Sequence, residues 1–287
     1  MNRLPSILTI LACCAFTPSA TAQTCPVTVG QIVEPEKPAS VYKKLLAANL
    51  TKGEFETTEQ YEIRKAAVGS SDLAKPIIVE AVYDPKATKY DADTQQLMVF
   101  QYAWDNSASG WGEVFDYRGE KYGIKVDSYG PNHGLGLGQT EKTAGSYSAS
   151  NAYGATTTVT KIERTVYSLF DRPGQKNSTD YKEKPTETWK FDGYADYSSN
   201  VGNLPNTGAV FVNIPIALAS TTKDSMRTGV YFSPKAPYNA TGDKYWAPRI
   251  NRPRETTATY NVIIGDIMCA VLMDKDGKVL KTIHTAY

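Results

Sequence analysis

Alternation of apolar and polar positions dominates the chain from residue 77 onward and predicts antiparallel β-strands. Residues 155–170 (ATTTVTKIERTVYSLF) are dense in β-branched and aromatic side chains, which favours one long or bent strand. TYNVIIGDIMCAVLMD and KVLKTIHTA flank DKDG and predict a hairpin near the C-terminus. Further strands are expected at residues 77–83, 96–104, 113–117, 122–129, 186–194, 209–216 and 227–233, with a hairpin between the third and the fourth.

Helical patterns occur before the first strand and once within the β-rich part. ASVYKKLLAANL (39–50) has apolar residues at helical spacing. In KGEFETTEQYEIRKAA (52–67), Thr57 and Gln60 fit a capping box, so a helix is expected at about 58–68. The four glutamates of this stretch are therefore interpreted as a solvated helix start and not as a catalytic set. A further helix is expected within ALASTTKDSM (217–226).

These elements predict an α+β fold, mainly antiparallel β, built as a sandwich-like or strongly twisted sheet. Two short N-terminal helices and one internal helix complete it. The expected organisation is a signal peptide at 1–22, an extended and helical segment at 23–75, and a β-rich domain at 76–287. Whether 23–75 forms one domain with the rest is left open.

The first 22 residues predict export. Met1 to Arg3 form a positive start, an apolar run follows, and Ala20 and Ala22 occupy the small positions that a signal peptidase requires. An alternative is a lipoprotein signal, with ILAC as the cleavage box and a lipid on Cys13. The expected location is periplasmic or secreted.

Charge argues against a nucleic-acid partner. The chain has 31 basic and 30 acidic residues, and loss of Arg3 with the leader makes it neutral, whereas nucleic-acid binding needs concentrated positive charge. No segment of the mature chain predicts a membrane span, because the most apolar one, residues 258–273, is too short and contains Asn261 and Asp266.

Cleavage of the leader leaves two of the four cysteines, Cys25 and Cys269. In an oxidising compartment, the simplest expectation is one disulfide between them, which would connect the N-terminus to a late strand. The alternative is two buried free thiols. A four-ligand zinc site would need both of these cysteines together with His133 and His284.

Three motifs carry a resemblance. They are Phe55-Glu56-Thr57 with Tyr61 and Arg64, then Tyr90 to Asp93, then Asn151-Ala152-Tyr153-Gly154 with Val159. In this order they resemble a group of exported bacterial proteins that share F-E-T-x-x-x-[YF]-x-x-R, Y-D-A-D and N-A-[FY]-G-x-x-x-x-V. The resemblance spans most of the mature chain. It implies export and a shared fold, and it brings no activity with it.

Candidate catalytic and metal-binding residues are few. His133, with Asp127 and Ser128 upstream, is the best-placed base, although a polar loop histidine is the simpler interpretation. GLGLG (134–138) lacks the context of a phosphate-binding loop. Calcium could use oxygen ligands from acidic turns, but aspartates also simply make turns. The aspartates concerned are Asp84, Asp91, Asp93, Asp274 and Asp276. No cofactor is implied.

The most suggestive surface lies in residues 234–256, which are expected to form a long irregular loop. Aromatic rings stack on sugars or cations, and guanidinium groups bind carboxylate or phosphate. An inward orientation of the aromatic rings is the alternative. The leading hypothesis is a non-enzymatic envelope or secreted protein that binds or scaffolds a protein or glycan. The runner-up is an extracytoplasmic hydrolase of glycan or peptide. The candidate binding residues are Tyr238, Tyr245, Trp246, Arg249, Arg252 and Arg254.

Overall fold

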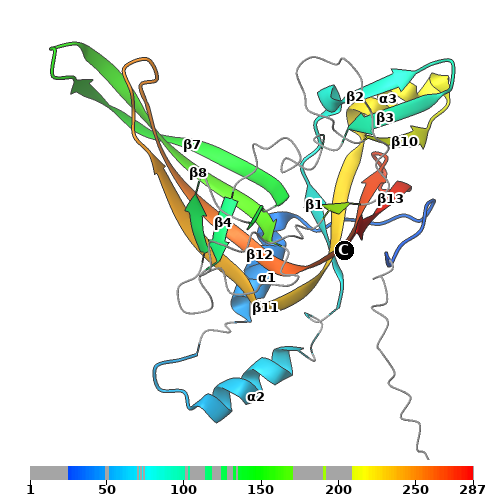
Figure 1. The fold of residues 1–287 in the computed structure, drawn as a ribbon, viewed down its shortest axis with the longest axis horizontal. Helices are drawn as coiled ribbons and strands as arrows, with labels where there is room; N and C mark the ends of the chain where they lie inside the picture. Colours follow the sequence, from blue (N-terminus) through cyan, green and yellow to red (C-terminus); the bar gives the residue numbers. More distant parts are fainter. Residues whose placement is uncertain are drawn as a thin grey trace, which may run out of the picture.

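The computed structural model describes residues 25–48, 52–69, 71, 73, 75–100, 103, 114–117, 124–127, 132–133, 135–170, 190–191 and 209–286. It has the expected fold class, α+β with a strongly twisted and mainly antiparallel sheet (Figure 1). The signal peptide predicted at residues 1–22, and the alternative of lipidation at Cys13, lie outside the described residues.

The α-helices lie where the sequence predicted them. Among the described residues the α-helices are α1 (Pro38–Ala47), α2 (Thr58–Gly69) and α3 (Ile216–Ser225), and a short 3-10 helix lies at Pro85–Ala87. Helix α1 begins with proline, which suits the first helical turn because its missing N–H needs no partner there. It buries Val41, Tyr42 and Leu45 against the large sheet.

The start of α2 is a capping box. The backbone N–H of Thr57 donates to Gln60 Oε1 (2.9 Å), and the backbone N–H of Gln60 donates to Thr57 Oγ1 (3.2 Å). Just upstream, Glu56 accepts two hydrogen bonds from Arg64 (2.8 and 2.7 Å) and one from the backbone N–H of Gly53. The Arg64 bonds lower the pKa of Glu56 to about 2. The interpretation of this acidic stretch as a helix start is confirmed.

One large sheet organises the molecule. Its main path runs in the order β1-β11-β12-β13-β9, and β8 and β7 extend it from the side of β12. The strands are β1 (Ile77–Ala81), β7 (Leu135–Ser150), β8 (Thr156–Phe170), β9 (Lys190–Phe191), β11 (Arg227–Trp246), β12 (Arg254–Met273) and β13 (Val279–Ala286). The predicted long strand at 155–170 and the C-terminal hairpin are confirmed.

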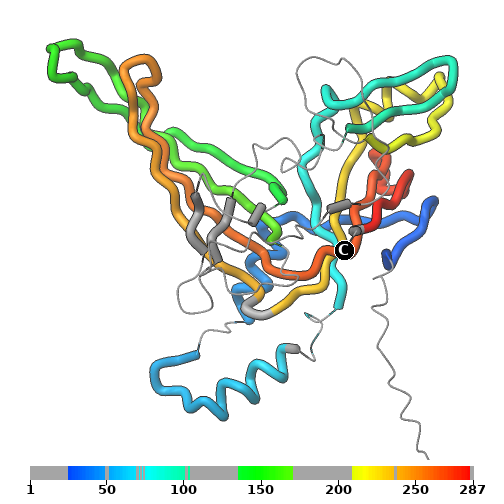
Figure 2. The backbone as a smooth tube through the Cα atoms, in the orientation of Figure 1, coloured from blue at the N-terminus to red at the C-terminus, as the bar shows by residue number. Residues whose placement is uncertain are grey.

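Strands β8 and β12 pair in parallel, which is the exception in an otherwise antiparallel sheet. Arg254 of β12 lies opposite Thr160 of β8, and the pairing continues to Ile264 opposite Phe170. This pairing joins the β7–β8 hairpin to the β11–β12 hairpin. We call the outer part of these four strands, residues 139–165 and 239–262, the arm. Figures 1 and 2 show its outer end projecting away from the helices.

Two smaller sheets accompany the large one. The first has the order β10-β3-β2, with strands β10 (Ala209–Asn213), β3 (Gln96–Phe100) and β2 (Thr88–Asp91). Strand β2 lies in a segment that the sequence pattern left as a connection. The second has the order β5-β4-β6, with strands β4 (Val114–Tyr117), β5 (Ile124–Asp127) and β6 (Asn132–His133). The predicted pairing of β4 with β5 is confirmed.

The main core fills the space between these layers. Buried residues of α1, such as Leu45, pack in the same cluster as Leu97 and Val212 of the β10-β3-β2 sheet and Ile263 and Ile267 of β12. A second cluster, centred on the fully buried Tyr260, extends from the base of the large sheet into the arm, and the partly buried Trp246 packs against it. The inner ends of the long strands are therefore anchored by apolar burial, and this leaves the outer ends free to project.

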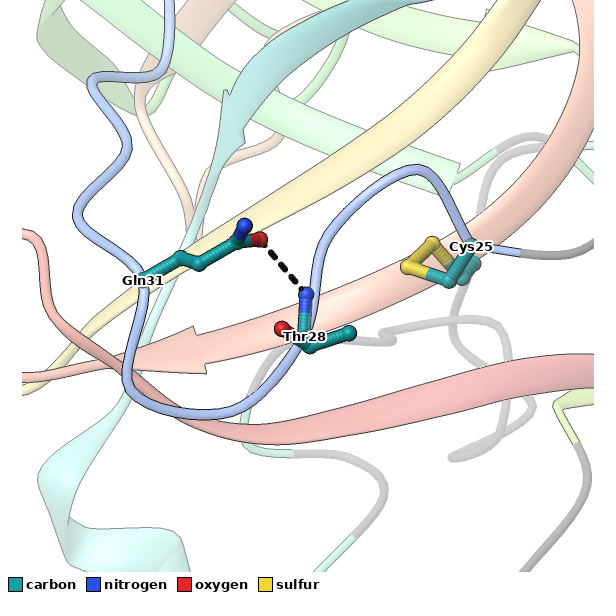
Figure 3. The surroundings of a disulfide bond; sticks show 4 residues. Cys25, Thr28 and Gln31 are labelled. Atoms are coloured by element: carbon teal, nitrogen blue, oxygen red, sulfur yellow. Dashed lines mark hydrogen bonds between the residues drawn. A yellow bond between two sulfur atoms is a disulfide. The ribbon is translucent and has the colours of Figure 1, made fainter.

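A disulfide ties the N-terminus to the large sheet. Cys25 and Cys269 are bonded, with their Cα atoms 5.5 Å apart, so the predicted bridge is confirmed and the alternative of free thiols is wrong. Figure 3 shows the surroundings, where Gln31 accepts a hydrogen bond from the backbone N–H of Thr28 (2.8 Å). The following residues hydrogen-bond to the C-terminal hairpin through Gly30 to Val279 (2.8 Å) and Val33 to Gly277 (2.9 Å).

Candidate functional site

Residues 234–256 do not form the predicted irregular loop. They are the outer part of β11, a short turn, and the start of β12, paired in register from Asn239 opposite Ile263 to Trp246 opposite Thr256. The prediction was wrong because polar and aromatic residues alternate here without the apolar face that identifies a strand from sequence, and the neighbouring strands supply the pairing. The candidate residues consequently lie at separate places in the hairpin.

Tyr238 belongs to the core. It is buried, with a positive φ of 68°, at the bulge where the β11–β12 register shifts between Pro234 and Asn239. Beside the bulge, Asn239 donates to the carbonyl of Leu45 (3.2 Å) and so fastens α1 to the base of the arm. Tyr238 is therefore not available to a ligand.

One face of the arm carries Trp246, and we call it the tryptophan face. Its members share one side of four adjacent strands and are Glu141, Arg164, Lys244, Trp246, Arg254 and Thr256. The Arg164 guanidinium lies 5.6 Å from the centre of the indole ring, and the Lys244 ammonium lies 5.0 Å from it. These are cation–π distances, so the ring is held in a positively charged surrounding.

A single carboxylate serves both guanidinium groups of this face. Arg164 donates through Nε to Glu141 Oε1 (2.7 Å), and Arg254 bonds the other oxygen of Glu141. The hydrogen bonds from Arg164 and then Arg254 lower the pKa of Glu141, so it stays ionised at neutral pH. The two guanidinium groups therefore share one carboxylate.

Two buried polar atoms on this face have no hydrogen-bond partner. They are Arg254 Nε and Thr256 Oγ1. Both residues lie on the same side of β12, and Thr256 is only 2 % exposed. An unsatisfied buried donor is unfavourable by about 1–3 kcal/mol. Such atoms are uncommon in folded proteins, and a bound ligand is one way to supply the missing hydrogen bonds.

The opposite side, which we call the tyrosine face, carries Tyr147, Lys161, Tyr245 and Glu255. Glu255 Oε2 accepts hydrogen bonds from the hydroxyls of Tyr147 (2.8 Å) and Tyr245 (3.2 Å). The bond to Glu255 raises the pKa of Tyr147, and burial together with the charge of Glu255 raises the pKa of Tyr245. The Lys161 ammonium lies 5.2 Å from the centre of the Tyr147 ring.

The turn of the β11–β12 hairpin holds Arg249 and Arg252. Each backbone N–H donates to the carbonyl of the other residue (2.9 Å), so the two arginines lie directly opposite each other. Ile250, between them, is 54 % exposed. The candidate residues thus fall into a buried position, two faces and a turn, and only Trp246 and Arg254 share a face.

Sequence reasoning missed Glu141, Arg164, Lys244 and Glu255 as members of these faces. Each looked like an ordinary charged strand residue. The alternation of polar residues in β8 and β12 was the available signal, but their neighbours follow from the parallel register, which no local pattern encodes.

Three of the five aspartates that were considered as calcium ligands stabilise turns through hydrogen bonds to the backbone. Asp84, Asp91 and Asp274 each accept hydrogen bonds from backbone N–H groups a few residues further on, Asp93 and Asp276 among them (2.9–3.3 Å). Within the described residues, no group of three or more histidine, cysteine or acidic side chains could hold a metal ion. No helix in this part of the chain is long and apolar enough to cross a membrane.

His133 lies in β6, where its backbone pairs with Val114, and its side chain is outside the described residues. His284 is exposed on β13, opposite Cys269. Both cysteines of the considered zinc site are occupied by the disulfide, which removes them as metal ligands.

The motifs that carry the resemblance lie at local structural points. Glu56 pairs with Arg64, Asp91 organises the turn after β2, and Asn151 accepts from the backbone N–H groups of Tyr153 (3.0 Å) and Ala155 (2.9 Å) in the β7–β8 turn. Comparison of the chain with protein-family models, with curated proteins and with solved structures finds no match. The function therefore has to be inferred from the geometry of the arm.

Proposed function

We propose that the protein is an exported, non-enzymatic binding protein whose arm holds an acidic glycan of the cell envelope on the tryptophan face. The observation that carries this proposal is the shared carboxylate. Arg164 and Arg254 both depend on Glu141, which leaves positive charge in excess beside an indole ring. Guanidinium groups match the planar geometry of carboxylates, and aromatic rings pack against sugars.

The two unsatisfied atoms add a reason for a ligand. Arg254 is held by Glu141, its side chain is 36 % exposed, and its Nε is buried without a partner. A carboxylate on an incoming sugar would draw this guanidinium outward and accept from it. The ligand would then remove an unfavourable interaction of the free protein, in addition to forming new ones.

The electrostatics support binding better than hydrolysis. A glycosidase needs one carboxylic acid with a raised pKa to protonate the leaving group. Among the described carboxylates whose pKa is perturbed, namely Glu34, Glu56, Asp91 and Glu141, every pKa is lowered. These groups are ionised partners of arginines or of backbone N–H groups, as a binding or structural role requires.

Calorimetric titration tests the proposal with an oligogalacturonate and with a neutral cello-oligosaccharide of equal length. We expect the acidic ligand to bind and the neutral ligand to bind at least about tenfold more weakly, because a charge-assisted hydrogen bond is worth roughly 1.5–3 kcal/mol. Arg254→Gln should reduce the affinity by a similar factor. Trp246→Phe should retain part of it and Trp246→Ala less.

Lys142→Gln is the matched control. Lys142 is also a cation of the arm, but it pairs with Glu163 and its side chain is 74 % exposed. Its loss should leave the affinity unchanged. Equal affinity for the acidic and neutral ligands, or an unchanged affinity in Arg254→Gln with circular dichroism like that of the wild type, would refute the proposal.

A further inference from the structure

The outer end of the arm consists of two hairpin turns, residues 151–155 and 247–253, which we call the apex. Both turns end on the same side of the molecule, away from α1 (Figures 1 and 2). The backbone N–H of Thr160 donates to the carbonyl of Pro253 (3.0 Å), so the second turn is fastened to β8. The apex thus consists of two separate hairpin tips, and the second is joined to the strand that follows the first.

The apex carries two arginines in an arrangement that is unfavourable for a β-hairpin. Arg249 and Arg252 are directly opposite each other on a two-stranded turn, and both are exposed. Like charges at opposite positions of an antiparallel pair are destabilising. Neither guanidinium forms an ion pair with a described residue, and neither turn contains an acidic residue. Positions that break such a rule without local compensation are candidates for function.

The carboxylates of the nearby arm are already used. Glu141 binds Arg164 and Arg254, and Glu163 pairs with Lys142. Asp243 accepts a hydrogen bond from the Thr259 hydroxyl, and Glu255 accepts from two tyrosine hydroxyls. None of these groups compensates the apex arginines. The positive charge of the apex is therefore available to an external anion.

Apolar side chains accompany this charge. Tyr153 is 94 % exposed in the first turn and Ile250 is 54 % exposed in the second, between the two arginines. An aliphatic side chain flanked by arginines, as Ile250 is, matches a bilayer interface, because the chain enters the headgroup region and the guanidinium groups remain with the phosphates. An exposed tyrosine, as Tyr153 is, is also typical of this interface. A soluble acidic polymer would use the charge but not the apolar side chains.

We propose that the apex docks onto a lipid bilayer surface with anionic headgroups. Arg249 and Arg252 bind headgroup phosphates, and Ile250 and Tyr153 insert at the interface. This surface is separate from the tryptophan face, so the arm could rest on a membrane by its end while it holds a glycan on its side. The inference does not depend on the proposed function.

Co-sedimentation with vesicles tests this inference. The probes are vesicles of phosphatidylcholine mixed with phosphatidylglycerol and vesicles of phosphatidylcholine alone. We expect binding to the mixed vesicles, weakened by salt. Arg249→Gln and Arg252→Gln should each weaken it on the order of fivefold, as for one basic residue near an anionic surface. Ile250→Asp should weaken it at least as much.

Matched controls separate the apex from general properties of the surface. Lys142→Gln removes one cation from the flank of the arm, and Ile63→Asp changes an aliphatic residue of α2 that is 65 % exposed. Neither should change vesicle binding. Binding that fails with the mixed vesicles, or that the controls weaken as much as the apex variants do, would overturn the inference. If vesicle binding fails, oligogalacturonate binding by the wild-type protein would show that the proposed function of the tryptophan face still holds while the inference about the apex does not.

Discussion

Reduction of the Cys25–Cys269 disulfide removes one covalent cross-link and leaves every other side chain of the protein unchanged. The bond joins two residues that are 244 positions apart, and it fastens the N-terminal segment to the C-terminal part of β12. Cys269 is fully buried, next to a small cluster that includes Val27 and Val271. We therefore expect the folded structure to change little when the bond is broken, whereas the unfolded chain gains conformational entropy.

The magnitude follows from the loop that the bond closes. The chain-entropy relation for a loop of 244 residues gives about 5 kcal/mol at 25 °C. Since domains are typically stable by about 5–15 kcal/mol, this contribution is a large share of the total. The backbone hydrogen bonds from Gly30 and Val33 to the C-terminal hairpin stay in place and keep the native segment positioned.

Urea unfolding, followed by circular dichroism, measures the effect on the wild-type protein with and without a phosphine reductant. The free energy of unfolding should fall by up to about 5 kcal/mol on reduction. The double variant Cys25→Ala, Cys269→Ala is the control for the reductant, and its stability should not respond to it. A loss below about 1 kcal/mol on complete reduction would refute the reasoning, because the denatured chain would then be compact with or without the bond.

Two further predictions concern local geometry. Gly277→Ala should destabilise the fold by about 1–3 kcal/mol in thermal unfolding, since φ is +82° and the new Cβ would lie 2.3 Å from the Val33 carbonyl oxygen. Gly30→Ala, with φ +94° and open space, should cost less. An NMR titration should give a pKa of about 2 for Glu56, and Arg64→Gln should raise this pKa because it removes the guanidinium that binds the carboxylate. The lowered pKa contributes to the free energy of unfolding when the pH is above the ordinary glutamate pKa of 4.5, and this contribution is lost as the pH falls toward 2.

Features with short-range causes could be predicted from the sequence. The capping box of Thr57 and Gln60, the aspartate turns and the strand at β8 depend on residues that are a few positions apart. The disulfide was predicted because only two of the four cysteines lie outside the expected signal peptide. Strand β7 went unpredicted, since its outer part is polar and mostly exposed, and it becomes a strand by pairing with β8.

The candidate site was predicted in composition but not in geometry. Trp246 and Arg254 were named from the sequence, but Tyr238 is buried and Arg249 and Arg252 lie at the apex. These differences follow from strand alternation and from the bulge before Asn239, which decide on which face each side chain lies.

The sequence by itself determined where the helices begin, where β8 and the C-terminal hairpin lie, and which cysteines can pair. Each of these properties depends on neighbours along the chain or on apolar content. Only the tertiary structure decided that β8 and β12 pair in parallel and that Arg164 and Arg254 share Glu141. Those contacts join strands that are distant in sequence, and their register is selected by the packing of the whole sheet and not by any local preference.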